Sequence, residues 1–334
     1  MKQQLKRLAE NVVSRSAALL WRTVPGPRLV VLMYHRVLPP DDPERRLEQP
    51  GMYVSPQTLE MHLTLLKAHF EPVHLDDWVR RAAAGQTLPR LACAITFDDG
   101  WRDNYVHGFP VLQRQQVPAT IFLVSSLIGT RDEFWPNRLA RLLAIDSSGK
   151  QLPRKLAELL APVLEAAAER GEWIAEHVDR AIELAKGLPE DEIQALLSEA
   201  QGQGSYAALG RAILDEQELH AMSASGLIRY GSHTRTHFRC REGASDAVLE
   251  QEIGTSRAEI AARVAQPIDL FCFPNGDFTP AALRVVRKHY LAAVTTQSGW
   301  HSPAQDAASI RRIGVHEDVS NRPESFLARL SGVL

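Results

Sequence analysis

The chain is poor in cysteine and in net charge, and each shortage excludes a class of protein. Only 3 of its 334 residues are cysteines, too few and too unpatterned for a disulfide-stapled scaffold, so we expect reduced thiols. Lysine plus arginine total 38 against 40 acidic residues, a formal charge of −2 that predicts no nucleic-acid partner. This length suits one large α/β domain with an insertion, or two domains.

Long apolar runs are also scarce near the N-terminus. The longest uninterrupted piece there is residues 17–21, too short for a signal-peptide core or a membrane span. Basic residues alternate with apolar ones at helical spacing, which predicts an amphipathic helix and linker over residues 1–27. That helix either docks on the domain or lies on a membrane surface. We therefore expect a cytoplasmic protein, in which the second alternative would place residues 1–24 on the inner face of the membrane.

Further along, apolar runs that are typical of buried strands alternate with segments that predict helices. The strand candidates are residues 29–34, 71–74, 91–97, 117–124, 227–231, 268–273, 290–295 and 309–316. The helix candidates between them start near 56, 76, 103, 216, 245 and 279. This alternation predicts a parallel sheet with right-handed crossovers. Asp98, Asp99, His233 and Pro274 all follow predicted strands, and a barrel converges such strand ends better than an open sheet does.

One region departs from the alternation. Between about residues 134 and 201 the chain is rich in alanine, leucine, glutamate and arginine and offers no good strand candidate. Its periodicity predicts helices over 138–145, 154–170, 173–184 and 191–200, with a break or kink at Pro162. We predict one domain over residues 28–330 that is interrupted by a helical insertion at about 131–214.

Two short motifs carry the chemistry. Asp98 and Asp99 are adjacent carboxylates after a buried run, and His233 and His237 are imidazoles four residues apart. Two neutral nitrogen donors and one carboxylate make a facial ligand set for a divalent metal, and the spare carboxylate can serve as a base on water. Either motif alone is weak evidence, because Asp-Asp-Gly commonly marks a turn. Their joint appearance after strands favours a hydrolytic metal site.

These motifs resemble a known family. Thr96-Phe97-Asp98-Asp99-Gly100 and His233-Thr234-Arg235-Thr236-His237 are similar to the first two signature motifs of the polysaccharide deacetylases, the NodB-homology or carbohydrate esterase family 4 enzymes. Residues 32–35 (Leu-Met-Tyr-His) and 271–276 (Phe-Cys-Phe-Pro-Asn-Gly) also resemble that family. The likeness covers roughly residues 28–130 and 215–318. It implies an α/β fold, a distorted (β/α) barrel of about seven strands, with the helical insertion outside the shared core.

The resemblance also implies roles for individual residues. Asp99, His233 and His237 match the metal ligands, and Asp98 matches the base, which agrees with the loss of basicity that a metal imposes on a bound carboxylate. The metal would polarise the acetyl carbonyl, and the backbone N–H of Asn275, after the Pro274 turn, would help to hold the oxyanion. We expect one divalent ion. Zn²⁺ suits this donor set best, and Co²⁺, Ni²⁺ and Fe²⁺ stay open.

Supporting positions depart from the family pattern. Cys272 stands where many members carry an arginine that orients the base, and Arg312 is a candidate substitute partner for Asp98. His316 is the closest match to the general acid, with His301 as the weaker candidate. His35 either lines the cleft or makes a structural hydrogen bond.

Aromatic residues offer candidate sugar contacts outside the signature motifs. Trp135 and Trp300 could each stack on a sugar ring or belong to the core or its rim.

The leading functional prediction is a metal-dependent hydrolase that removes N-acetyl groups from a polysaccharide or from its lipid- or nucleotide-linked sugar precursor. Its partner would be an N-acetylated carbohydrate. Two alternatives stay open. One is hydrolysis of another linear or cyclic amide on the same fold, and the other is a non-catalytic homologue that binds or scaffolds glycan.

Overall fold

A computed structural model describes residues 10, 13, 21, 23–145, 149–150, 152–201 and 210–331. The helix predicted over residues 1–27 lies almost wholly outside these described residues. Within them, every helix is too short or too polar to cross a membrane.

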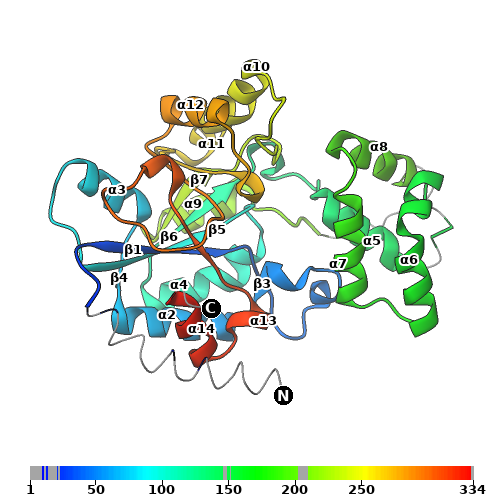
Figure 1. Cartoon of the computed structure of the whole chain (residues 1–334), viewed down its shortest axis with the longest axis horizontal. Coiled ribbons are helices and arrows are strands. Elements are labelled where there is room, and N and C mark those ends of the chain that lie inside the picture. The colour runs from blue at the N-terminus through cyan, green and yellow to red at the C-terminus, as the bar shows by residue number, and fades with distance from the viewer. Residues whose placement is uncertain are drawn as a thin grey trace.

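The core of the fold is a curled parallel sheet (Figure 1). Its strands are β1 Arg28–Tyr34, β4 Glu71–Pro72, β5 Leu91–Phe97, β6 Ala119–Leu123, β7 Ile228–Ser232, β8 Leu270–Cys272, β9 Ala292–Val294 and β10 Ile313–Gly314. They follow the order β10-β1-β5-β6-β7-β8-β9, with β4 beside β5. Ile310 bridges to Val294 of β9, and Ile313 pairs with Leu32 of β1, so this segment crosses from one edge of the sheet to the other. The predicted distorted (β/α) barrel is confirmed.

That crossing also explains a shortened strand. The sequence predicted a strand over residues 309–316, and the structure keeps only Ile313–Gly314. A segment that pairs with β9 at Ile310 and with β1 at Ile313 is too short to form a regular strand with either.

The sheet buries two different faces. One face packs on the surrounding helices through large side chains such as Leu32 and Ile121. The other is enclosed by the curl and uses smaller side chains, including Ala92 and Ala94, closed at its base by Trp78. Because strand side chains alternate, Thr96 and Asp98 continue the enclosed face. The interior of the barrel therefore leads directly to the acidic motif.

Helices surround the curled sheet. They are α2 Pro56–His69, α3 Leu75–Ala83, α4 Phe109–Gln115, α9 Glu216–Ser223, α10 Asp246–Leu249, α11 Ser256–Val264, α12 Pro280–His289, α13 Glu317–Ser320 and α14 Pro323–Leu330. The predicted start signals function as expected. The Ser55 hydroxyl caps α2 with Pro56 in its first turn, and Asp215 with Glu218 forms a capping box at α9.

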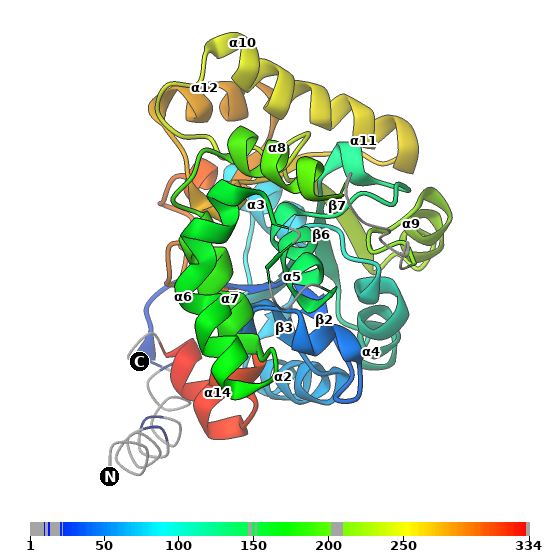
Figure 2. The same ribbon diagram turned by 90° about the vertical axis from the view of Figure 1, so that its right-hand side faces the viewer.

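The helical insertion projects from the barrel (Figures 1 and 2). Its helices are α5 Trp135–Ile145, α6 Arg154–Arg170, α7 Ala175–Ala185 and α8 Glu190–Gln201, within a few residues of the prediction. They bury their own apolar cluster, which includes Leu143, Leu160 and Ile182. Of the break or kink predicted at Pro162, the break is wrong, because α6 is continuous, and the kink stays a prediction. Leu160 and Val163 are buried on either side of the proline, and their packing offsets its missing N–H donor.

Candidate metal centre

The strand ends bring the predicted ligands together. Asp99 follows β5, and His233 follows β7. One ligand atom from each of Asp99, His233 and His237 lies within 4.8 Å of the others. The Nε2 atoms of both histidines are 3.5 Å from Asp99 Oδ1. Asp99 and His237 are 138 positions apart in the sequence (237 − 99). They thus converge, as the barrel topology predicted.

The backbone takes rare conformations at these residues. Asp99, Thr234 and His237 have φ values of 73°, 63° and 64°. Left-handed backbone is uncommon for residues with a side chain and gathers at functional sites, where surrounding structure enforces it. Here Glu252 holds the histidine loop, since its carboxylate accepts hydrogen bonds from the Arg235 N–H at 3.0 Å and the Thr236 N–H at 2.9 Å.

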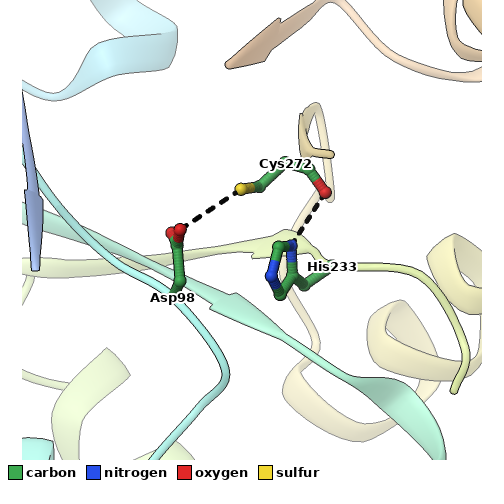
Figure 3. A group of neighbouring side chains, drawn as sticks. All are labelled: Asp98, His233 and Cys272. Carbon is green, nitrogen blue, oxygen red and sulfur yellow. Dashed lines mark hydrogen bonds between the residues drawn. The ribbon is translucent and has the colours of Figure 1, made fainter. Parts of the chain in front are cut away.

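Neighbouring groups orient the ligands. His233 Nδ1 donates to the backbone carbonyl of Cys272 at 2.8 Å (Figure 3), which leaves the Nε2 lone pair directed toward Asp99. Trp101 Nε1 donates to Asp99 Oδ2 at 2.9 Å, so Oδ1 is the oxygen that faces the histidines. Burial lowers the pKa of both His233 and His237 to about 4, which keeps the imidazoles neutral. Neutral nitrogen donors and one carboxylate fit a divalent cation.

Asp98 has a different main partner, although one of its oxygens lies within 4.8 Å of a ring nitrogen of His233. Burial alone would raise its pKa, but the Arg312 guanidinium outweighs burial and holds the pKa well below its usual range. Arg312 donates to both carboxylate oxygens at 2.7 Å and to Thr96 Oγ1 at 3.1 Å. Arg312 comes from the segment before β10, so it is the partner of Asp98 that the sequence offered as a substitute for the motif-three arginine. Asp98 is therefore ionised while it remains outside the ligand set.

Cys272 occupies the position of the missing arginine and contacts the same pair. Its Sγ lies 3.5 Å from Asp98 Oδ2 (Figure 3) and 3.2 Å from an Arg312 nitrogen. Burial raises the pKa of this thiol well above its ordinary value. The small Cys272 side chain leaves room for Arg312 to reach Asp98 across the barrel. Because the thiol is protonated, it is no nucleophile.

A cavity of about 990 Å³ opens above these residues. His35, Asn275 and Trp135 line it, whereas Pro274 is buried in the turn beneath Asn275. Its far wall comes from the insertion and includes Trp135, Asn137, Arg138, Leu188, Glu190 and Gln194.

Three sequence candidates lie elsewhere. The His316 side chain pairs with Asp318 and is not among the residues that line the cavity. His301 is buried against Trp78 at the opposite end of β1, where it bridges to Leu29. Trp300 packs on Phe70 and donates to the Leu330 carbonyl, so it is a partly buried residue at the rim of the core. The residues that neighbour them in the sequence did not reveal that these three side chains lie outside the cavity lining.

Sequence reasoning missed two cavity residues. Trp101 directly follows the acidic motif, and Phe134 directly precedes α5, the first helix of the insertion; both have aromatic rings beside the ligands. The adjacency of Trp101 to Asp99 was a usable signal. Nothing in the sequence marked Phe134.

The profile of the polysaccharide deacetylase family matches residues 85–294. The chain belongs to this family. Over 117 residues the chain is 28% identical to poly-beta-1,6-N-acetyl-D-glucosamine N-deacetylase of Escherichia coli K12, covering 35% of this chain and 17% of that protein. The chain thus aligns with about a sixth of that curated relative.

Solved structures of other proteins share the fold of this chain. The deacetylase PplD of Streptococcus pyogenes, in complex with acetate, superposes with a TM-score of 0.60 at 18% identity, over 92% of this chain and 99% of that one. IcaB of Ammonifex degensii gives 0.59 at 19% identity, over 91% and 98% of the two chains.

Proposed function

We propose that this deacetylase removes N-acetyl groups from a carbohydrate, either a polysaccharide or its lipid- or nucleotide-linked precursor, with a divalent cation held by Asp99, His233 and His237. The observation that carries the proposal is the separation of two adjacent carboxylates. Asp99 faces two neutral imidazoles. Asp98 is not one of the proposed ligands, and its pairing with Arg312 keeps it ionised. The E. coli relative is named for N-acetylglucosamine, which makes that sugar the first to test.

The residues of the site would have separate roles in amide hydrolysis. A bound cation would polarise the acetyl carbonyl and acidify a water molecule. Asp98 would accept the proton of the attacking water, because its pairing with Arg312 keeps the carboxylate ionised. Asn275 lies on the tight turn after β8 at the cavity, where its backbone N–H would support the developing oxyanion.

His35 is better placed than His316 to protonate the leaving amine. His35 Nε2 lies 3.9 Å from Asp98 Oδ2, and its side chain lines the cavity with 20% exposure. Asn104 Nδ2 donates to the His35 carbonyl at 2.8 Å and holds this strand end in place. We therefore propose His35 as the general acid.

Acetate release from poly-β-1,6-N-acetylglucosamine and from N-acetylglucosamine oligomers tests the proposal. Asp98→Asn should lower turnover at least about a hundredfold while the protein retains its metal, because general-base catalysis is lost and the ligands are intact. His233→Ala should instead lose the metal, measured by elemental analysis. Retained turnover in Asp98→Asn would contradict the role of the base.

The two histidines are compared in the same assay. His35→Asn should lose at least about a hundredfold in turnover, the typical worth of a general acid, and His316→Asn should lose much less. The reverse order would assign the acid to His316. Metal-loaded protein that releases acetate from none of these sugars, but ammonia from another amide, would overturn the deacetylase proposal itself.

A further inference from the structure

Both ends of the helical insertion meet the loop that carries Asp99. At its return, Ile213 bridges to Trp101, and the Leu214 N–H donates to the Gly100 carbonyl at 3.0 Å. At its start, the Phe134 ring lies 5.1 Å from the Trp101 ring, centroid to centroid. The insertion therefore leaves and rejoins the barrel on either side of one tryptophan.

Trp101 in turn fixes the Asp99 carboxylate. The indole is 2% exposed, and its Nε1 donates to Asp99 Oδ2 at 2.9 Å. Without that donor the carboxylate could rotate and present both oxygens to a metal. With it, one oxygen is held and the other stays toward His233 and His237.

The insertion also reaches the indole through Arg36. The Arg36 guanidinium lies over the Trp101 ring, with Cζ 4.3 Å from its centroid. Arg36 donates to Glu48 Oε2 at 2.7 Å, and Asn137 Nδ2 of α5 donates to the same oxygen at 3.0 Å. All of these groups are buried, so the connection from α5 to Trp101 is shielded from water.

Phe134 touches a second ligand. Its ring lies 5.2 Å from the His237 ring with an interplanar angle of 70°, an edge-to-face contact. A residue near the start of the insertion thus packs on Trp101, which holds Asp99, and on His237 itself.

We propose that the insertion is a positioning element for the metal ligands. Trp101 selects the Asp99 oxygen that faces the cation, and Phe134 with Asn137 holds Trp101 and the His237 ring in place. This inference rests on the metal set of the proposed function, but it needs no particular substrate.

Titration of the full chain with Co²⁺, followed by its visible absorption, tests the inference. Trp101→Phe keeps a ring between Arg36 and Phe134 but removes the N–H donor. We expect about tenfold to a hundredfold weaker Co²⁺ binding and an altered absorption spectrum, since partners of metal ligands typically contribute this much to affinity. Phe134→Ala and Asn137→Ala should weaken binding in the same direction.

Matched variants separate positioning from general stability. Phe134→Tyr keeps the ring and should bind Co²⁺ as the wild type does. Arg154→Ala changes a side chain of α6 that is 92% exposed and should also leave binding unchanged. A purely structural role would lower the melting temperature of the metal-free variants and leave the affinity and spectrum of their folded Co²⁺ forms unaltered.

The inference is overturned if Phe134→Ala and Asn137→Ala, or a folded Trp101→Phe, keep the wild-type affinity and spectrum. It is also overturned if the wild type binds no Co²⁺. A wild type that binds Co²⁺ with these variant effects, yet releases no acetate from any sugar, would contradict the proposed deacetylation alone.

Discussion

At the scale of single residues, the pair formed by Asp98 and Arg312 decides the character of the site. Both are buried, and two hydrogen bonds of 2.7 Å join them. Bidentate pairing keeps the carboxylate ionised in a dry barrel interior, where an unpaired acid would be neutral. Cys272 stands beside the pair as a small, protonated neighbour. An arginine from a different strand region thus supplies the positive charge that the motif around Cys272 lacks.

Arg312→Met should destabilise the protein by about 3–5 kcal/mol, the usual cost of leaving one partner of a buried ion pair alone. Urea denaturation of the metal-free chain measures this loss. The double variant Asp98→Asn/Arg312→Met should be destabilised by less than the sum of the two single variants, because no stranded charge remains. Additive losses would show that the two groups act independently.

At the scale of elements, segments that depart from regular helix and strand geometry position the residues of the site. The sequence predicted one helix over residues 245–264, and the structure interrupts it with a π-helical stretch, Glu250–Thr255. This stretch carries Glu252, whose carboxylate holds the histidine loop. A second π-helical stretch, Asn104–Gly108, follows the acidic motif and holds His35 through Asn104. Such π insertions are frequent at functional sites because they redirect side chains within a helix.

The turn after β8 is another such element. Gly276 has a φ of 74°, and a Cβ there would overlap the Thr296 side chain. Gly276→Ala should therefore destabilise the protein by about 2–4 kcal/mol, combining backbone strain with overpacking. Thermal or urea unfolding measures the loss.

Gly171→Ala is the matched control. Gly171 ends α6 with a φ of 80°, and no described atom lies within 4 Å of its Cβ position. It should cost about 1 kcal/mol from backbone strain alone. Equal losses in the two variants would show that Thr296 moves aside freely.

At the scale of the whole molecule, a buried histidine connects β1 and α2 to the C-terminal helices α13 and α14. His62 of α2 donates from Nε2 to the Ser320 carbonyl at 2.7 Å, accepts from the Tyr34 hydroxyl at 3.0 Å, and stacks on Phe326 of α14. Burial lowers its pKa from 6.5 to about 4. The C-terminal helices are thereby fixed to β1 and α2 by a neutral imidazole.

This linkage makes stability depend on pH. His62 binds a proton more readily in the unfolded chain, so acid favours unfolding, and its contribution is lost as pH falls from about 6.5 toward 4. Between pH 7 and pH 5 the wild type should lose about 2 kcal/mol more stability than His62→Gln, whose amide can make both hydrogen bonds without titrating. Urea denaturation at the two pH values measures the difference. Parallel losses would contradict a neutral buried His62.

The sequence by itself determined the barrel and the placement of the two motifs. Strand runs, helix caps and motif order are local signals, and parallel topology then sends Asp98, Asp99 and His233 to one end of the sheet. Only the tertiary structure decided the surroundings. It brought Arg312 to Asp98 across the barrel, set His35 rather than His316 in the cavity, and returned the insertion to Trp101. Contacts between distant segments depend on how each strand end bends, and no short stretch of sequence encodes that.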